Sequence, residues 1–101
     1  MEQIKSEDLR NAVLTWTGRK TTPSPLRDDG LVLKSFGKKG KMLLDQIKAL
    51  EDDFYKSDAH LRAASLVEME QMAIQHFTAL HPDLDKEIAQ AFAWCYSFDY
   101  K

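Results

Sequence analysis

The chain has little of what cross-links a protein, anchors it in a membrane or interrupts helices. Its 101 residues include one cysteine, three prolines and four glycines, and no apolar run approaches the roughly 20 residues that span a bilayer. One cysteine excludes an internal disulfide, and a lone thiol is typical of a reducing compartment. Residues 1–8 are acidic and lack the apolar stretch of a signal peptide. We therefore expect a cytoplasmic protein with no membrane partner.

The sequence also lacks a recognisable catalytic or metal-binding set. His76 and His81 are five positions apart, about 140° around a helix, so they do not converge on one ion. Cys95 has no histidine or basic neighbour and lies on the apolar stripe of a predicted helix, so we expect a buried, inert thiol. These observations predict that the protein is not an enzyme and holds no metal or cofactor.

The composition is that of an ordinary globular protein. Hydrophobic residues make up 44% of the chain and charged residues 30%, which excludes a disordered or membrane class. A chain of this length holds one domain with one core. Apolar residues recur every three to four positions and predict helices near 6–18, 41–56, 58–80 and 84–97. The expected fold is an all-α single domain, residues 1–101, of about four helices.

The apolar stripes of these helices predict the core. The helix at 41–56 has the cleanest amphipathic pattern, because its apolar positions fall in one narrow stripe. Glu70 falls near the middle of the stripe of the helix at 58–80, so we expect it to pair with a buried arginine, tyrosine or tryptophan, while a functional role stays open. The predicted core residues are Leu43, Ile47, Leu50, Phe54, Leu66, Phe77 and Ile88.

The segment 19–40 interrupts the helical pattern. It holds two of the three prolines and three of the four glycines. Proline fixes φ and biases the preceding residue away from helix. We therefore predict a long irregular loop with at most one short strand near 31–33. Loops of this length are uncommon in compact domains unless they have a function.

Charge is segregated along the chain. Segment 19–41 carries seven basic and two acidic residues (+5), whereas segment 42–101 carries five basic and eleven acidic residues (−6). Either the basic segment neutralises the protein's own acidic helices, or it forms a surface for an acidic partner. The residues assigned to such a surface are Arg19, Lys20, Lys38, Lys39 and Lys41.

Two further features bear on binding. The three lysines of residues 38–41 crowd a predicted helix start, where cations oppose the helix dipole and a bound anion would relieve the conflict; a helix that begins earlier would remove this conflict. Residues 92–100 hold five of the ten aromatic residues. Trp94 and Tyr96 point away from the apolar stripe of their helix, so either they anchor an interface or they pack under another element.

These patterns favour a non-catalytic protein-interaction module of the inhibitor, immunity-protein or regulatory-subunit type. It would bind its partner through the basic loop and the carboxy-terminal aromatic residues. The alternative is a protein that binds nucleic acid or a phosphate anion through segment 19–41. The overall acidity opposes this alternative, because a phosphate backbone is repelled everywhere except at the basic segment. No nucleic-acid-binding sequence signature supports it either.

Overall fold

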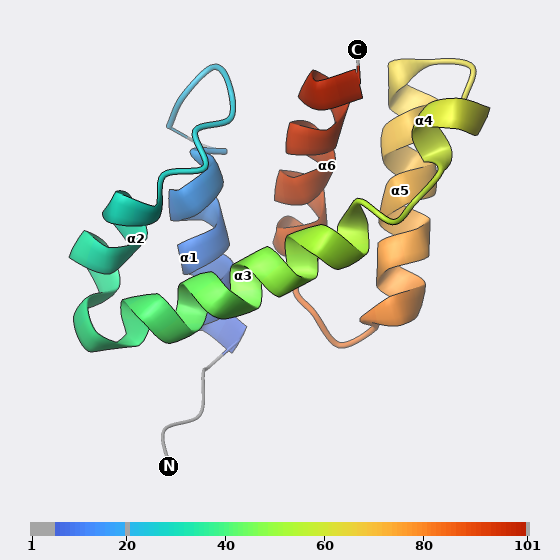
Figure 1. Cartoon of the computed structure of the whole chain (residues 1–101). Coiled ribbons are helices and arrows are strands. Elements are labelled where there is room, and N and C mark those ends of the chain that lie inside the picture. The colour runs from blue at the N-terminus through green and yellow to red at the C-terminus, as the bar shows by residue number, and fades with distance from the viewer. Residues whose placement is uncertain (1–5, 20, 101) are drawn as a thin grey trace.

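The computed structural model describes residues 6–19 and 21–100, and every regular element in these ranges is helical (Figure 1). The elements are α1 (Ser6–Thr17), α2 (Asp29–Phe36), the 3-10 turn η1 (Gly37–Lys39), α3 (Gly40–Phe54), α4 (Ala59–Arg62), α5 (Leu66–Leu80) and α6 (Lys86–Tyr100). The all-α class is confirmed. The four longest helices, α1, α3, α5 and α6, correspond to the four predicted segments.

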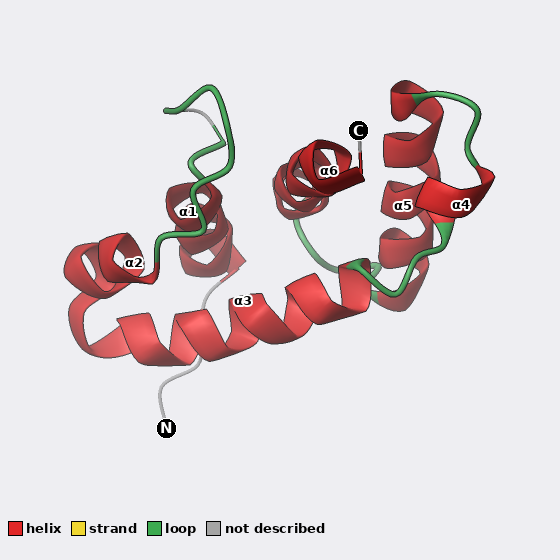
Figure 2. Cartoon of the chain, turned by 45° about the horizontal axis from the view of Figure 1, so that its top comes forward, coloured by secondary structure: helices red, strands yellow, loops and turns green. Residues whose placement is uncertain are grey.

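The helix α3 crosses the other long helices, as Figures 1 and 2 show. Helix α6 packs between α1 and α5, and α2 folds back against α1 and α3. Within residues 6–19 and 21–100, no helix is both long and apolar enough to cross a membrane.

An aromatic cluster around Phe54, the last residue of α3, joins α3 to α5 and α6. The ring centroid of Phe54 lies 5.2 Å from that of Phe77, 5.9 Å from that of Phe92 and 5.7 Å from that of Tyr96. All four side chains are buried. Six of the seven predicted core residues are buried. The exception is Leu66, for which the prediction is wrong because the residue is 45% exposed at the start of α5.

The predicted irregular loop over 19–40 is shorter than expected, because residues 29–39 form α2 and η1. The predicted strand at 31–33 is wrong, because these residues lie in the middle of α2. The Asp28 carboxylate accepts a hydrogen bond from the Leu31 N–H and thereby caps the helix. Val32 is buried on the inner face of α2. Gly40 lets α3 approach α2 closely, since a Cβ there would lie 2.9 Å from the Leu33 Cα. The cap and this packing turn a segment rich in turn residues into a helix.

The helix predicted at 58–80 is interrupted between α4 and α5. Ala63 is extended, with ψ 146°, and Ser65 caps α5 by accepting a hydrogen bond from the Glu68 N–H. The Glu68 carboxylate in turn accepts one from the Ala64 N–H at 3.4 Å. This exchange resembles the Ser-x-x-Glu capping box, a sequence signal that the spacing of apolar residues does not detect.

The interruption also changes which side chains of α5 face the core. The buried residues of α5 are Met69, Ala73 and Phe77. Glu70 is half-buried and lies beside this face, not at its centre. The prediction that Glu70 lies in the middle of the apolar stripe and therefore needs a buried partner is wrong.

Candidate functional site

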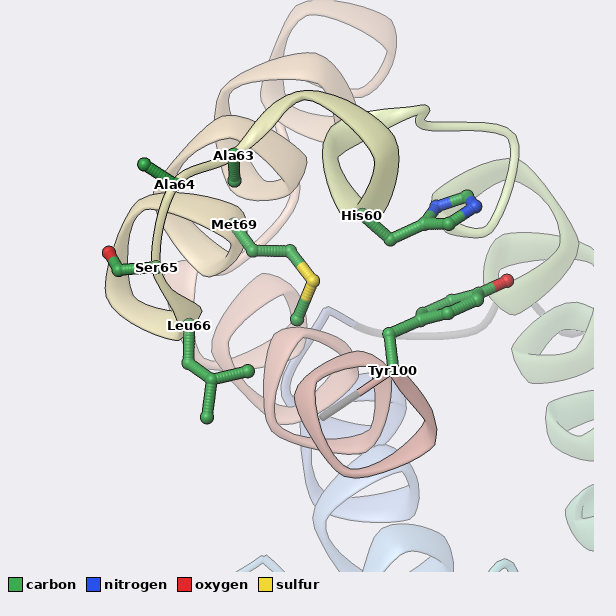
Figure 3. A pocket seen from close by; sticks show the side chains of 7 residues that line it. All are labelled: His60, Ala63, Ala64, Ser65, Leu66, Met69 and Tyr100. Carbon is green, nitrogen blue, oxygen red and sulfur yellow. The ribbon is translucent and has the colours of Figure 1, made fainter.

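Leu66 and Tyr100, two exposed apolar side chains, border a surface pocket formed by α4, the link to α5 and the end of α6 (Figure 3). Leu61 of α4 is 78% exposed and Val67 of α5 is 66% exposed, the two highest values among the large hydrophobic residues of the described ranges. Each is the chain neighbour of a residue that lines this pocket, which has a volume of about 260 Å³. We call it the α4–α5 pocket; its lining residues are His60, Ala63, Ala64, Ser65, Leu66, Met69 and Tyr100.

The pocket exists because the chain breaks its helix and places small residues at the break. Ala63, Ala64 and Ser65 form the extended link between α4 and α5. Their short side chains leave space that a larger residue would fill. Leu66 and Met69, from the first turn of α5, border that space on one side. Figure 3 shows the Met69 thioether directed into the space between Leu66 and Tyr100.

The opposite wall is a pair of stacked rings. The His60 and Tyr100 ring centroids lie 4.0 Å apart with an interplanar angle of 14°. The buried Tyr96 hydroxyl holds His60 in place: it donates to the Ser57 carbonyl at 2.9 Å and accepts from the His60 backbone N–H at 3.1 Å. The same hydroxyl lies 2.6 Å from His60 Nδ1.

The hydrogen bonds of the Tyr96 hydroxyl are compatible with one tautomer of His60. Tyr96 has one hydroxyl proton, which the Ser57 carbonyl accepts, so the contact with His60 Nδ1 is satisfied when that nitrogen carries a proton. Burial raises the pKa of the Tyr96 hydroxyl, although its hydrogen bonds to His60 and Ser57 oppose the rise. These contacts fix the position of the His60 ring, on which the Tyr100 ring stacks.

The two aromatic residues predicted as partner contacts have different surroundings. Tyr96 has no exposed area and supports the pocket from within, so it does not contact a partner directly. Trp94 is half-buried, and the Arg19 guanidinium lies 5.7 Å from its ring centroid. Tyr100, which was not singled out, lines the pocket instead. Its position four residues after Tyr96, on the same helical face, was the available signal.

The structure does not bring the predicted basic residues together. Arg19 follows α1, whereas the Lys39 ammonium lies 3.5 Å from the Asp8 carboxylate in the first turn of α1. Because the twelve residues of α1 span about 18 Å, Arg19 and Lys39 lie near opposite ends of this helix. Lys38 and Lys41 flank Lys39 and are exposed. The remaining predicted residue, Lys20, lies outside the described residues.

These lysines do not precede a bare helix start either. The chain passes from α2 through the 3-10 turn η1 directly into α3. The Gly40 N–H at the start of α3 donates to the Gly37 carbonyl. The backbone N–H of Gly40 is therefore already satisfied, and the expected conflict between cations and an open helix end is reduced.

Another residue of the basic segment neutralises the protein's own acidic helices. Arg27 Nε lies 2.9 Å from a Glu51 carboxylate oxygen, and Arg27 Nη2 lies 2.6 Å from Asp99 and 2.5 Å from the Tyr55 hydroxyl. The Tyr55 hydroxyl also donates to Asp99. We call these four side chains the Arg27 clasp.

The ionisation of the clasp follows from these contacts. Burial alone would raise the pKa of Asp99, but the hydrogen bonds from Arg27 and Tyr55 outweigh it and lower the pKa. Burial and the hydrogen bond to Asp99 raise the pKa of the Tyr55 hydroxyl. Arg27 itself adopts a left-handed backbone conformation, with φ +52°, which non-glycine residues rarely adopt.

The described residues offer neither an accessible thiol nor a metal-binding group. Cys95 is buried, and burial raises the pKa of its thiol to about 12. No group of three or more histidine, cysteine or acidic side chains in the described ranges could hold a metal ion.

A second hollow, of about 390 Å³, lies between α1, the following loop and α2. It has no aromatic wall, and its lining residues are Asn11, Leu14, Thr15, Thr21 and Leu31. Leu31 and its exposed neighbours are less exposed than Leu61 or Val67. The α4–α5 pocket is therefore the stronger candidate for a binding site.

Comparisons with models of known protein families, with characterised protein sequences and with solved structures find no significant match. The fold and the site therefore define the class on their own: a small all-α protein with a surface pocket lined by small, apolar and aromatic side chains.

Proposed function

We propose that the protein is a non-catalytic interaction module that binds another protein at the α4–α5 pocket, in the manner of an inhibitor, an immunity protein or a regulatory subunit. The observation that carries the proposal is a surface pocket walled by the stacked rings of His60 and Tyr100, with the strongly exposed Leu61 and Val67 adjacent in the chain to two of its lining residues. Contiguous exposed apolar surface marks interaction sites in folded proteins. A preformed wall also lowers the entropy lost on binding.

The size of the pocket favours a protein side chain over a small molecule. Its volume of about 260 Å³ is below the roughly 300–1,000 Å³ of small-molecule sites. It exceeds the roughly 150 Å³ that holds a benzene ring in an engineered cavity. One anchoring side chain from a partner therefore fits the space, and the exposed residues around it supply the surrounding contact.

The cytoplasm is the compartment that goes with this proposal, since the single cysteine is a free thiol. The alternative function, binding of nucleic acid or a phosphate anion by segment 19–41, is less well supported. Arg27 and Lys39 already pair with acidic side chains of the same chain. That leaves fewer free cations for a phosphate backbone.

The test compares three forms of the full chain as baits in lysate from the organism of origin. The forms are the wild type, a pocket variant (Leu66→Ser with Tyr100→Ser) and a basic-segment control (Lys38→Glu with Lys41→Glu). Circular dichroism first establishes that each form is folded. Captured proteins are quantified by mass spectrometry, and the strongest candidate is purified and its affinity measured by calorimetry.

We expect the purified partner to bind the wild type and the control equally, and the pocket variant at least tenfold more weakly. Equal affinity for the pocket variant would contradict the proposal. Nucleic acid retained by the wild type and lost from the basic-segment control, with steep salt dependence, would favour the alternative.

A further inference from the structure

The charges around the α4–α5 pocket indicate what kind of partner fits it. Resting on the proposed function, we infer that the pocket receives one large apolar side chain from a basic segment of a different protein. The inference goes beyond the position of the site to the chemistry of its occupant. The inference rests on the carboxylates beside the pocket, on the pairing of the nearby lysine and arginine, and on the aromatic wall.

Acidic residues outnumber basic ones in the segment that runs from the end of α3 through the pocket residues of α4 and α5, and three of them, Asp58, Glu68 and Glu70, lie in α5 or just before α4. Residues 51–70 contain six acidic and two basic side chains. Glu68 lies at the rim, because its carboxylate accepts a hydrogen bond from the backbone of the pocket residue Ala64. Glu70 follows Met69 and is one helical turn from Leu66, so it lies on the same side of α5 as these two lining residues.

The two cations of this segment do not neutralise the rim. Lys56 is paired with Asp53 at 3.0 Å, outside the pocket lining. Arg62 of α4 lies 3.5 Å from Asp58, and both side chains are exposed. Asp58 therefore offsets Arg62. Among residues 58–70, the carboxylates of Glu68 and Glu70 therefore leave a net negative charge beside the pocket lining. Such a charge attracts a basic segment and accelerates its association.

The same charges argue against a second copy of this chain as the occupant. A symmetric dimer places the same patch of both molecules face to face. Here that contact would oppose the rim carboxylates of one copy to those of the other. Like charges in such contacts disfavour association. A basic partner meets no such repulsion.

The pocket wall indicates the type of anchor. One wall is the stacked pair His60 and Tyr100, and Met69 lies across from it (Figure 3). Aromatic rings pack favourably against other rings, and the methionine sulfur makes favourable contacts with them. An aromatic or large aliphatic side chain therefore suits the space, which holds about 260 Å³.

The test selects ligands from random peptides, so the natural partner need not be identified first. A phage library of random 12-residue peptides is panned against the full wild-type chain, and the enriched sequences are synthesised with a fluorophore. Fluorescence anisotropy then measures their affinity for four forms. These are the wild type, the pocket variant Leu66→Ser with Tyr100→Ser, the rim variant Glu68→Lys with Glu70→Lys, and a control, Asp45→Lys with Asp83→Lys. The control has the same net charge as the rim variant, but its substitutions lie in α3 and in the link before α6.

We expect the enriched peptides to carry net positive charge and one aromatic or large aliphatic residue. Replacement of that residue by alanine, or use of the rim variant, should weaken binding about tenfold or more, whereas the control should change it less than about threefold. Peptides that bind the pocket but are neutral or acidic, or that ignore the rim variant, would overturn this inference and leave the proposed function standing. Peptides that bind the pocket variant as well as the wild type would contradict the proposed function itself.

Analytical ultracentrifugation of the wild type and the pocket variant tests whether a second copy of this chain occupies the pocket. We expect both forms to sediment as monomers at micromolar concentrations. A wild-type dimer that the pocket variant does not form would identify a second copy as the occupant and overturn the inference.

Discussion

Asp99 and Tyr100 are neighbours at the end of α6, yet they belong to two regions with opposite properties. Asp99 closes the Arg27 clasp, in which every side chain contacts another at 2.9 Å or less. Tyr100 lines the α4–α5 pocket, where it is 42% exposed beside other exposed apolar residues. The clasp is a network of polar groups that bond to one another, whereas the pocket leaves aromatic and aliphatic side chains open to solvent.

The difference separates what stabilises the fold from what is left for binding. The clasp connects the loop after α1 to the ends of α3 and α6, so its contacts oppose unfolding. The exposed apolar area at Leu61 and Val67 contributes little to the fold, because it stays in water. Both regions rest on the aromatic cluster, since Phe54 precedes Tyr55 of the clasp and contacts Tyr96 below the pocket.

The largest effect is expected where the two regions share support. Phe54→Ala removes a fully buried ring and should lower the free energy of unfolding by ~3–5 kcal/mol, measured by urea denaturation. Gln71→Ala, at an exposed position on α5, serves as the control and should change it by less than ~0.5 kcal/mol. A loss below ~1 kcal/mol for Phe54→Ala would show that the cluster does not support both regions.

Breaking the clasp alone should have an intermediate effect. Arg27→Ala leaves Asp99 and Glu51 without their cation and should cost ~1–2 kcal/mol, since hydrogen bonds to charged groups are stronger than neutral ones and this site is partly exposed. Arg27→Gly makes the same loss but relieves the left-handed backbone, so it should be more stable than Arg27→Ala by ~1 kcal/mol. Equal stability of the two variants in thermal and urea unfolding would argue against strain at this position.

The clasp should also make stability depend on acid. The pKa of Asp99 is lower in the folded protein than in the unfolded chain, so its contribution is present above pH ~4 and is lost as the pH falls through the folded value. In Asp99→Asn, the decline of the free energy of unfolding below about pH 5 should be shallower than in the wild type. Tyr100→Ala, in the pocket, should keep the wild-type slope; unchanged slopes in both variants would remove Asp99 as a source of the acid sensitivity.

The smallest effect on stability is expected at the exposed residues that adjoin the pocket lining. Leu61→Ser with Val67→Ser should change the free energy of unfolding by less than ~0.5 kcal/mol per site, because both side chains are exposed in the wild type. Urea denaturation at neutral pH measures this, with Phe54→Ala as the sensitive reference. A loss of several kcal/mol would mean that these residues are structural and would erase the contrast between the regions.

Sequence periodicity predicted the helices that have a continuous buried stripe. In α3 the stripe includes Leu43, Ile47, Leu50 and Phe54, all of which are buried. Two departures followed from local chemistry that periodicity ignores. The Asp28 cap and the buried Val32 make α2 a helix. The hydrogen bonds of Ser65 and Glu68 begin a new helix at α5.

The sequence by itself determined the all-α class, the long amphipathic helices and most of the core, because these depend on neighbours three and four residues apart. Only the tertiary structure decided the sites. Arg19 and Lys39 belong to one basic segment, but the length of α1 separates them. The pocket forms only when Tyr100 of α6 stacks on His60 of α4. Contacts between residues so far apart in the chain depend on how whole helices pack, and no local pattern specifies that packing.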